Sequence, residues 1–225
     1  MSVLFSLGLD YENQRVYDKV TGNNLIELDT SGGGVTSSQL IKIENNNPVL
    51  DLTEDGIRYL IPGNSKYDIS QGEDFAISTV IRYNGINDAI DTVGTLFGSF
   101  LKEGNSHLQT TVFNLGTSFL NIYTLVTYVV DAQINFSINN PYSDYHHYLI
   151  KRENSILSVY IDGELKGSTP LINAYYFYSY NIGLFCINKN FIDQSGYNPT
   201  YGEIKSFTWY KGIISSEIYN NIKID

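Results

Sequence analysis

The 225-residue sequence contains a single cysteine, Cys186, so no disulfide can form within the chain. This cysteine lies in the apolar stretch Gly-Leu-Phe-Cys-Ile without a basic neighbour, and we expect an inert core thiol rather than a nucleophile. The chain also lacks any run near the roughly 18 apolar residues of a membrane-spanning helix. Its start has no basic region of the kind that opens a signal peptide. We therefore expect a product of the cytosol without a targeting or membrane-spanning segment.

Charged residues are scarce as well, at 17% of the chain against roughly 25% in ordinary soluble domains. The 14 basic and 24 acidic residues give a formal net charge of −10. Because this charge would repel phosphate backbones and anionic membrane surfaces, we expect neither nucleic acid nor a membrane as a partner. Polarity comes instead from amides and phenols, since asparagine is frequent and there are 19 tyrosines.

Apolar residues at helical spacing are missing from the chain until its carboxyl end. Short runs rich in β-branched and aromatic residues alternate with turn signals, which is typical of an antiparallel sandwich or barrel. These runs are residues 75–83, 94–100, 107–115, 121–130, 132–138, 145–152, 156–162, 181–187 and 202–210. No repeat or linker is visible, so we expect residues 1–225 to form a single domain. For residues 1–40 the alternative is an extended amino-terminal arm.

The clearest single element is the stretch ILSVYIDGELKGS, residues 156–168. Leu157, Val159 and Ile161 share one face of a strand because side chains alternate. Asp162-Gly163 is a strong signal for a type I′ turn, in which both central residues need a positive φ. Together with the preceding run, the stretch predicts a meander of three strands from residue 145 to about 167.

The continuous pattern YHHYLIKRENSILSVYIDGELKGS resembles the central hairpin of laminin G-like jelly rolls in the concanavalin A-like superfamily. The segment YDKVTGNN, residues 17–24, is similar to a pattern near the start of many such domains. The segment GEIKSFTWYKGIISSEIYNNI, residues 202–222, resembles their closing strand, followed by a short helix capped by Ser215. The resemblance implies an all-β fold, a jelly-roll sandwich of two antiparallel sheets with a short C-terminal helix.

Proteins of this superfamily often bind glycans, and they occur on phage tails, capsid fibres, toxins and secreted polysaccharide enzymes. The missing signal peptide, the missing disulfides and the composition rich in asparagine and tyrosine favour a bacteriophage virion protein. A binding domain of the clostridial-toxin type resembles the chain in the same way, and we rank it lower because nothing in the sequence suggests the other domains of a toxin.

The sequence contains few candidates for catalytic residues. The chain has three histidines, His107, His146 and His147, and the adjacent pair points to opposite faces of a strand, whereas zinc needs three or four converging ligands. Glycoside hydrolysis needs two carboxylates in one cleft. The glucanases of the superfamily supply them from a Glu-aliphatic-Asp-any-Glu pattern, in which this chain has Glu27 and Asp29 but lacks the third acid. We therefore expect no catalytic residue.

Two further sets of acidic residues are candidates for a functional site. Asp51 and Asp55 share a face only if their segment is extended, and Asp55-Gly56 favours a turn. Calcium needs six to eight oxygen ligands from several loops. No contiguous sequence motif supplies such a set of ligands, so we expect no metal site and no cofactor, with calcium as the alternative. The candidate calcium ligands are Asp131, Asn140, Asp144 and Asp193.

The residues best suited to bind a sugar are tyrosines. Tyr176, Tyr178 and Tyr180 fall on one face of an extended segment, and their rings are apolar platforms with a polar rim. Asn173 and Asn181 are the nearby amide partners. The alternative is that these tyrosines pack in the core, as we expect for the single tryptophan in residues 202–210.

Three functions follow as hypotheses. The first is a non-catalytic, lectin-like module of a phage virion that binds a glycan or receptor on the host surface. The second is a structural virion protein, a head or tail decoration that assembles with other virion proteins or with copies of itself. The third is a glycoside hydrolase.

Overall fold

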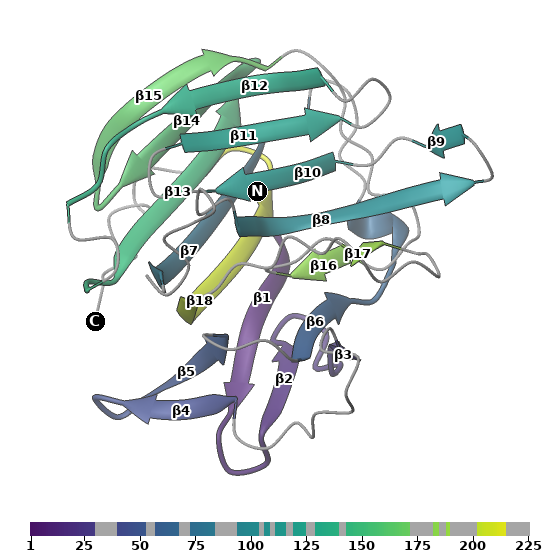
Figure 1. Ribbon diagram of the computed structural model, residues 1–225, viewed down its shortest axis with the longest axis vertical. Helices are drawn as coiled ribbons and strands as arrows, with labels where there is room; N and C mark the ends of the chain where they lie inside the picture. The colour runs from purple at the N-terminus through teal and green to yellow at the C-terminus, as the bar shows by residue number, and fades with distance from the viewer. Residues whose placement is uncertain are drawn as a thin grey trace.

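The computed structural model describes residues 1–29, 40–52, 57–67, 73–83, 94–103, 106–108, 111–115, 119–124, 129–139, 143–171, 182–184, 188–189 and 202–214. In this part of the chain the regular structure consists of strands and one 3₁₀ turn, η1 (Ser65–Tyr67), without an α-helix. The strands form two sheets that lie face to face (Figure 1). None of these segments is a helix long and apolar enough to span a bilayer.

The first sheet has the strand order β15-β14-β13-β7-β18-β1-β2, and the hairpin β4-β5 joins it through β18. Its strands are β1 (Ser2–Asp10), β2 (Arg15–Asp18), β4 (Ile41–Glu44), β5 (Asn47–Leu52), β7 (Phe75–Tyr83), β13 (His146–Glu153), β14 (Ile156–Ile161), β15 (Glu164–Pro170) and β18 (Gly202–Lys211).

The second sheet has the order β12-β11-β10-β8-β16-β6-β3, with β9 and β17 both paired to β8. Every pair in the two sheets is antiparallel except β17 with β8. The predicted antiparallel, two-sheet jelly-roll sandwich is therefore confirmed. The strands are β3 (Ile26–Asp29), β6 (Ile57–Ile61), β8 (Gly94–Glu103), β9 (Ser106–Leu108), β10 (Thr111–Leu115), β11 (Phe119–Thr124), β12 (Val129–Asn135), β16 (Ile182–Leu184) and β17 (Asn188–Lys189).

Several strands match their predicted runs closely, and β7 matches residues 75–83 residue for residue. Two predicted runs were wrong as single strands. Residues 107–115 contain β9 and β10, and residues 121–130 contain the end of β11 and the start of β12. Neither run has a glycine, proline or asparagine at the break between its two strands, residues 109–110 and 125–128, so the sequence pattern alone predicts one strand instead of two.

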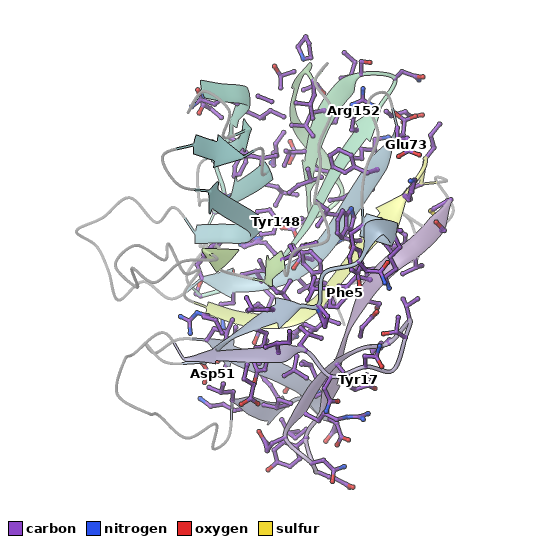
Figure 2. All side chains as sticks on the ribbon, turned by 90° about the vertical axis from the view of Figure 1, so that its right-hand side faces the viewer. Phe5, Tyr17, Asp51, Glu73, Tyr148 and Arg152 are labelled. Atoms are coloured by element: carbon purple, nitrogen blue, oxygen red, sulfur yellow. The ribbon has the colours of Figure 1, made fainter. Side chains whose placement is uncertain are left out.

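The core fills the space between the two sheets, where Phe5 and Tyr148 are labelled in Figure 2. Trp209 is fully buried and stacks on Tyr67 with ring centroids 5.5 Å apart, so the tryptophan is in the core as predicted. Leu157, Val159 and Ile161 are at most 2% exposed, which confirms the buried face of the predicted hairpin. Each such aliphatic side chain stabilises the fold by roughly 1.5–3 kcal/mol.

The meander β13-β14-β15 is confirmed, and tight turns set its register. Asp162 and Gly163 both have a positive φ, at 50° and 88°, between the paired residues Ile161 and Glu164. This is the predicted type I′ turn. The β13-β14 connection is a turn of the same kind, since Asn154 and Ser155 also have a positive φ.

The segment YDKVTGNN closes around a buried carboxylate. Asp18 is 3% exposed, and its Oδ1 accepts hydrogen bonds from the backbone N–H of Ser6 and of Val20. The Thr21 hydroxyl donates to the other oxygen, and Gly22 adopts a φ of 76° where the chain turns back. The Asp, Thr and Gly of this segment therefore shape a turn that fastens β2 to β1.

The outer face of the first sheet carries a second, smaller apolar cluster of Ala76, Leu149, Tyr210 and Ile214. Ile214 is the last described residue, and it is 7% exposed. The C-terminal helix expected from Ser215 onward lies outside the described residues.

Candidate functional site

The tyrosine platform predicted from the sequence lies outside the described part of the chain. This holds for Tyr176, Tyr178 and Tyr180 and for the two amides, Asn173 and Asn181. It also holds for Cys186. The platform therefore stays a prediction, and the site must be sought among the residues that the structure places.

The two adjacent histidines have structural partners on opposite sides of β13. His146 Nδ1 lies 2.6 Å from Asp162 Oδ2, and the backbone N–H of His147 donates to Asp162 Oδ1 at 2.8 Å. The aspartate of the I′ turn thus clasps the start of β13. We call these contacts the hairpin clasp, formed by His146, His147, Asp162 and Ser78. Its last member, Ser78, shares a 2.8 Å hydrogen bond with His147 Nε2.

The Ser78–His147 pair is not arranged as a nucleophile and its base. Both side chains are 4% exposed, and Asp162 contacts the backbone of His147 rather than its imidazole. A nucleophilic serine needs a base whose side chain is oriented by a third group. It also needs to be accessible to the substrate. Burial lowers the pKa of His147, which keeps its imidazole neutral and suits a structural hydrogen bond.

The other acidic candidates do not come together among the placed residues. Glu27 is exposed on β3 in the second sheet, whereas Asp51 is buried on β5 in the first sheet and pairs with Lys42. Asp144 is exposed. The residues that the structure describes contain no group of three His, Cys, Asp or Glu side chains placed to hold a metal ion. The described part of the chain leaves out five other candidates. These are the side chains of Asp29 and Asp131 and all atoms of Asp55, Asn140 and Asp193.

A charged cluster that the sequence did not reveal lies where β4, β7 and β18 meet. Arg82 Nε donates to Glu203 Oε2 at 2.6 Å, and its guanidinium also pairs with Glu44. The Tyr145 hydroxyl donates to Glu44 Oε2 at 2.6 Å, and burial together with this bond raises the pKa of Tyr145. Arg82 lies 4.4 Å and Lys205 lies 4.2 Å from the centre of the Tyr145 ring. These side chains bond to one another across three strands. The cluster therefore fastens the β4-β5 hairpin to the sheet.

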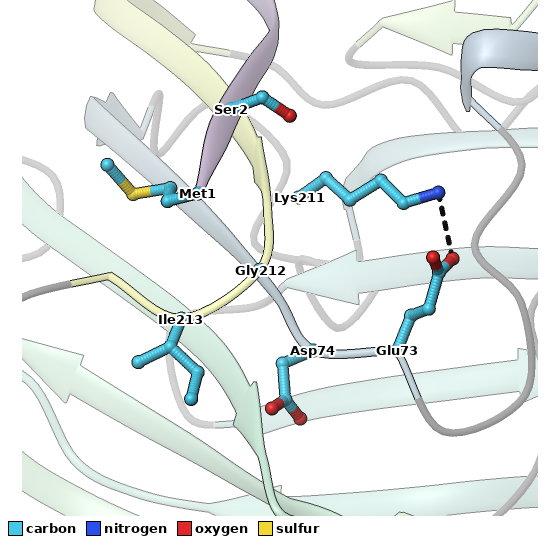
Figure 3. A pocket seen from close by; sticks show the side chains of 7 residues that line it. All are labelled: Met1, Ser2, Glu73, Asp74, Lys211, Gly212 and Ile213. Carbon is cyan, nitrogen blue, oxygen red and sulfur yellow. Dashed lines mark ion pairs between the residues drawn. The ribbon is translucent and has the colours of Figure 1, made fainter.

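A cavity of about 420 Å³ opens where three neighbouring strands of the first sheet begin or end (Figure 3). We call it the strand-end pocket. It lies beside the start of β1, the end of β18 and the residues that lead into β7. Its lining consists of Met1, Ser2, Glu73, Asp74, Lys211, Gly212 and Ile213.

The strand-end pocket combines apolar and charged walls. Met1 and Ile213 are 54% and 49% exposed, so their apolar side chains are accessible to a ligand. Glu73 Oε2 and Lys211 Nζ form an ion pair at 2.9 Å on another side. In Figure 3 the Glu73 side chain reaches toward Lys211, whereas the Asp74 carboxylate points the other way, toward the side of the pocket where Ile213 lies.

Arg152, at the end of β13, holds the acidic side of the pocket in place. Its guanidinium is 2% exposed and donates to the carbonyl oxygens of Leu171 at 3.0 Å and Glu73 at 2.9 Å. It also pairs with Asp74 Oδ1 at 3.3 Å, and the N–H of Asn154 donates to the same oxygen at 3.0 Å. The arginine of the hairpin motif therefore positions the loop that carries both carboxylates.

The opposite side depends on Gly212, which has a φ of 89°. Its N–H donates to the Asp74 carbonyl at 2.6 Å. A Cβ atom at this glycine would lie 3.3 Å from Met1 Cα, so a larger residue would press on the first strand. The chain can turn here, from β18 across the head of β1, because the residue is a glycine.

Known proteins resemble this chain in fold but not in sequence. No family model and no curated protein matches the sequence. The chain is similar to the binding domain of Paraclostridial Mosquitocidal Protein 1, with a TM-score of 0.59 and 16% identity over 96% of this chain and 50% of that one. It is similar to the binding domain of botulinum neurotoxin serotype D, with a TM-score of 0.60 and 16% identity over 97% and 50%.

A third similar structure matches over nearly its whole length. Domain 4 of AbnA, a GH43 extracellular arabinanase from Geobacillus stearothermophilus solved in complex with arabinotriose, has a TM-score of 0.59 and 14% identity over 95% of this chain and 94% of that one. The chain spans about half the length of the two toxin structures. Toxin-type binding domains, ranked below virion proteins on the sequence, are thus among the similar structures. At these identities the chain shares with them the β-sandwich fold.

Proposed function

We propose that this chain is a non-catalytic binding module that recognises a carbohydrate or a receptor. The observation that carries the proposal is the strand-end pocket, where exposed apolar side chains and carboxylates face one cavity. Pockets of this mixed kind, with a few convergent polar groups, are typical of small-ligand sites. The likeness of the fold to a domain solved with arabinotriose supports a carbohydrate as the ligand.

Within this proposal the module belongs to a bacteriophage virion and attaches it to a glycan or receptor on the host surface. The lack of an intrachain disulfide and the composition rich in asparagine and tyrosine support this setting. A single sugar contact is weak. Several copies on one particle would multiply a modest affinity, because each further contact is made at a high effective concentration.

The tyrosine platform is proposed as a second contact surface. Alternation along an extended segment would place the three rings roughly 6.5–7 Å apart on one face. Such a face would meet the flat side of one or two sugar units, and the neighbouring asparagines would bind their hydroxyl groups.

The test is a glycan-array and cell-binding assay with multimerised protein. Wild type is compared with a variant in which Tyr176, Tyr178 and Tyr180 are all changed to Ala, and each is assayed with and without a chelator. We expect binding by wild type, weaker binding by the folded variant, and no effect of the chelator. Loss of binding in chelator would identify a calcium ion as part of the site.

Two outcomes would replace the proposal. Wild type that binds no glycan or cell in any format, but assembles into a symmetric oligomer, would favour the structural virion protein. Release of reducing ends from a polysaccharide, measured in the same samples, would favour the glycoside hydrolase.

A further inference from the structure

The hydrogen-bonding groups of the strand-end pocket define the ligand that it can accept. Asp74 Oδ1 is engaged by Arg152 and by the N–H of Asn154. Its second oxygen, Oδ2, takes part in no hydrogen bond with any residue that the structure places. An ionised carboxylate oxygen is purely an acceptor. The pocket therefore offers an unused acceptor, which is complementary to a ligand that donates hydrogen bonds.

The charges around the pocket select against an anionic ligand. Glu73 and Asp74 bring two negative charges to the lining, and Lys211 and the Arg152 guanidinium that pairs with Asp74 bring two positive charges. These ion pairs compensate the charges of the lining locally. The formal net charge of −10 on the whole chain still repels a ligand with a carboxylate or sulfate.

The Glu73–Lys211 pair suits a ligand with neighbouring hydroxyl groups. Its two side chains are 35% and 33% exposed, and the bond between them presents an acceptor and a donor side by side. A vicinal diol, which both donates and accepts, matches that arrangement. The bonds it makes to charged groups are stronger than those between neutral groups.

The apolar side of the pocket matches the remaining surface of such a ligand. Met1 and Ile213 expose methyl and methylene groups, and Ser2 adds a hydroxyl between the apolar and charged sides. A sugar ring presents C–H groups on one face and hydroxyls around its rim. A cavity of about 420 Å³ lies within the usual range of roughly 300–1,000 Å³ for small-ligand sites.

We infer that the strand-end pocket binds the end of a neutral oligosaccharide, with Asp74 and the Glu73–Lys211 pair contacting its hydroxyl groups and Ile213 and Met1 packing on its ring. This inference rests on the proposed function and names its ligand class and its place. The site is held in shape before the ligand arrives, because Arg152 fixes the acidic loop and Gly212 fixes the turn opposite. A preformed site loses little conformational entropy on binding.

The experiment titrates ¹⁵N-labelled protein with arabinotriose, cellotriose and maltotriose as neutral probes. Trigalacturonate is the anionic probe and a lysine-rich peptide is the amine probe. We expect at least one neutral trisaccharide to shift the amide signals of Asp74 and Gly212. Trigalacturonate should bind at least about tenfold more weakly, because the formal net charge of −10 on the chain repels it.

Two variants and two matched controls locate the site. Glu73→Gln should weaken the binding of the neutral probe about tenfold and Ile213→Ser about threefold, through loss of a charge-assisted hydrogen bond and of apolar contact. Glu164→Gln removes the carboxylate of another surface pair, with Lys166, and Leu165→Ser removes another exposed apolar side chain. Both controls should bind as wild type does. The melting temperature of each variant is measured to show that it is folded.

The outcomes separate the inference from the proposed function. If wild type binds a neutral trisaccharide but both pocket variants bind equally well, the inference is wrong and the proposed function stands, with the tyrosine platform as the site. Stronger binding of trigalacturonate or of the peptide in the pocket would also overturn the inference. If no saccharide binds by this method or on the glycan array, both fail together.

Discussion

The hairpin clasp and the strand-end pocket use similar polar residues of the same sheet in opposite ways. In the clasp, the two oxygens of Asp162 are taken up by His146 and by the His147 backbone, and Ser78 engages the His147 ring. In the pocket, the carboxylates line a cavity, and Asp74 Oδ2 makes no hydrogen bond to any residue that the structure describes. Residue type alone therefore does not distinguish the structural clasp from the proposed binding site. Among the described residues the buried His146 Nε2 of the clasp also lacks a hydrogen-bond partner, so the feature that separates the two regions is the cavity beside Glu73 and Asp74.

Arg152 holds the loop of the strand-end pocket from β13, the strand that carries the two histidines of the clasp, and its loss is expected to have the largest effect. Its buried guanidinium bonds to the carbonyls of Glu73 and Leu171 and to the Ser155 hydroxyl. Arg152→Met should lower the free energy of unfolding by about 3 kcal/mol or more, because it leaves buried acceptors unpaired. Urea unfolding measures the change. Lys151→Met, which removes a partly exposed neighbour on the same strand, is the control and should cost less than about 1 kcal/mol.

The same variant also tests whether the shape of the strand-end pocket depends on the hairpin. We expect Arg152→Met to shift the amide signals of Asp74 and Gly212 as well as those of β13. Signals of the pocket that stay in place would show that the loop of Glu73 and Asp74 holds its shape without the arginine.

The I′ turn between β14 and β15 is the next most sensitive position. Gly163 has a φ of 88°, where a β-branched residue is strained. Gly163→Val should cost about 2 kcal/mol, seen as a clear drop in melting temperature. Gly163→Asn should cost less, because asparagine tolerates a positive φ. Equal melting temperatures for wild type and the valine variant would contradict the assigned turn.

Acid should weaken the clasp. Burial lowers the pKa of His147 in the folded protein from its ordinary value of 6.5, so the unfolded chain binds the proton more readily. Stability is therefore fully present above about pH 6.5 and is lost as the pH falls below that value toward the lower folded pKa. We expect a smaller loss than for Gly163→Val, measured by urea unfolding at about pH 7.5 and about pH 5.5.

His147→Gln is the control for this prediction, because an amide can still bond to Ser78 but does not titrate in this range. The difference in stability between the two pH values should shrink in the variant. An unchanged difference would assign the acid sensitivity to other groups.

The sequence predicted the elements whose signals are local. The turn at Asp162-Gly163, the buried face of Leu157, Val159 and Ile161, and the two-sheet class all follow from neighbours in the chain. The two wrong strand runs also have a local cause, the absence of a turn residue at the break between the two strands.

The strand-end pocket could not be predicted in this way. It forms because β1 pairs with β18 at opposite ends of the chain, which brings Ser2 beside Lys211. Glu73 then joins from the entry to β7. The charged cluster at Arg82 is equally non-local, since Glu44 comes from the β4-β5 hairpin and Glu203 from β18. Pairing of distant strands carries no signature in either segment alone, whereas the predicted tyrosines were chosen because they are neighbours in the chain.

The smallest expected effect sharpens the comparison most, because it applies one chemical change to both regions. Asp162→Asn and Glu73→Gln each replace a carboxylate by the amide of the same shape. In the clasp the change weakens charge-assisted bonds to His146 and His147 and should cost about 1 kcal/mol in the free energy of unfolding. In the pocket the lost ion pair is a third exposed, and exposed pairs contribute little, so the cost should stay below about 0.5 kcal/mol. Glu164→Gln, on β15, sets the level for an ordinary surface pair. Urea unfolding of the three variants at one pH measures the difference. If Glu73→Gln costs as much as Asp162→Asn, then Glu73 supports the fold in the same way as the clasp, and the distinction between the two regions fails.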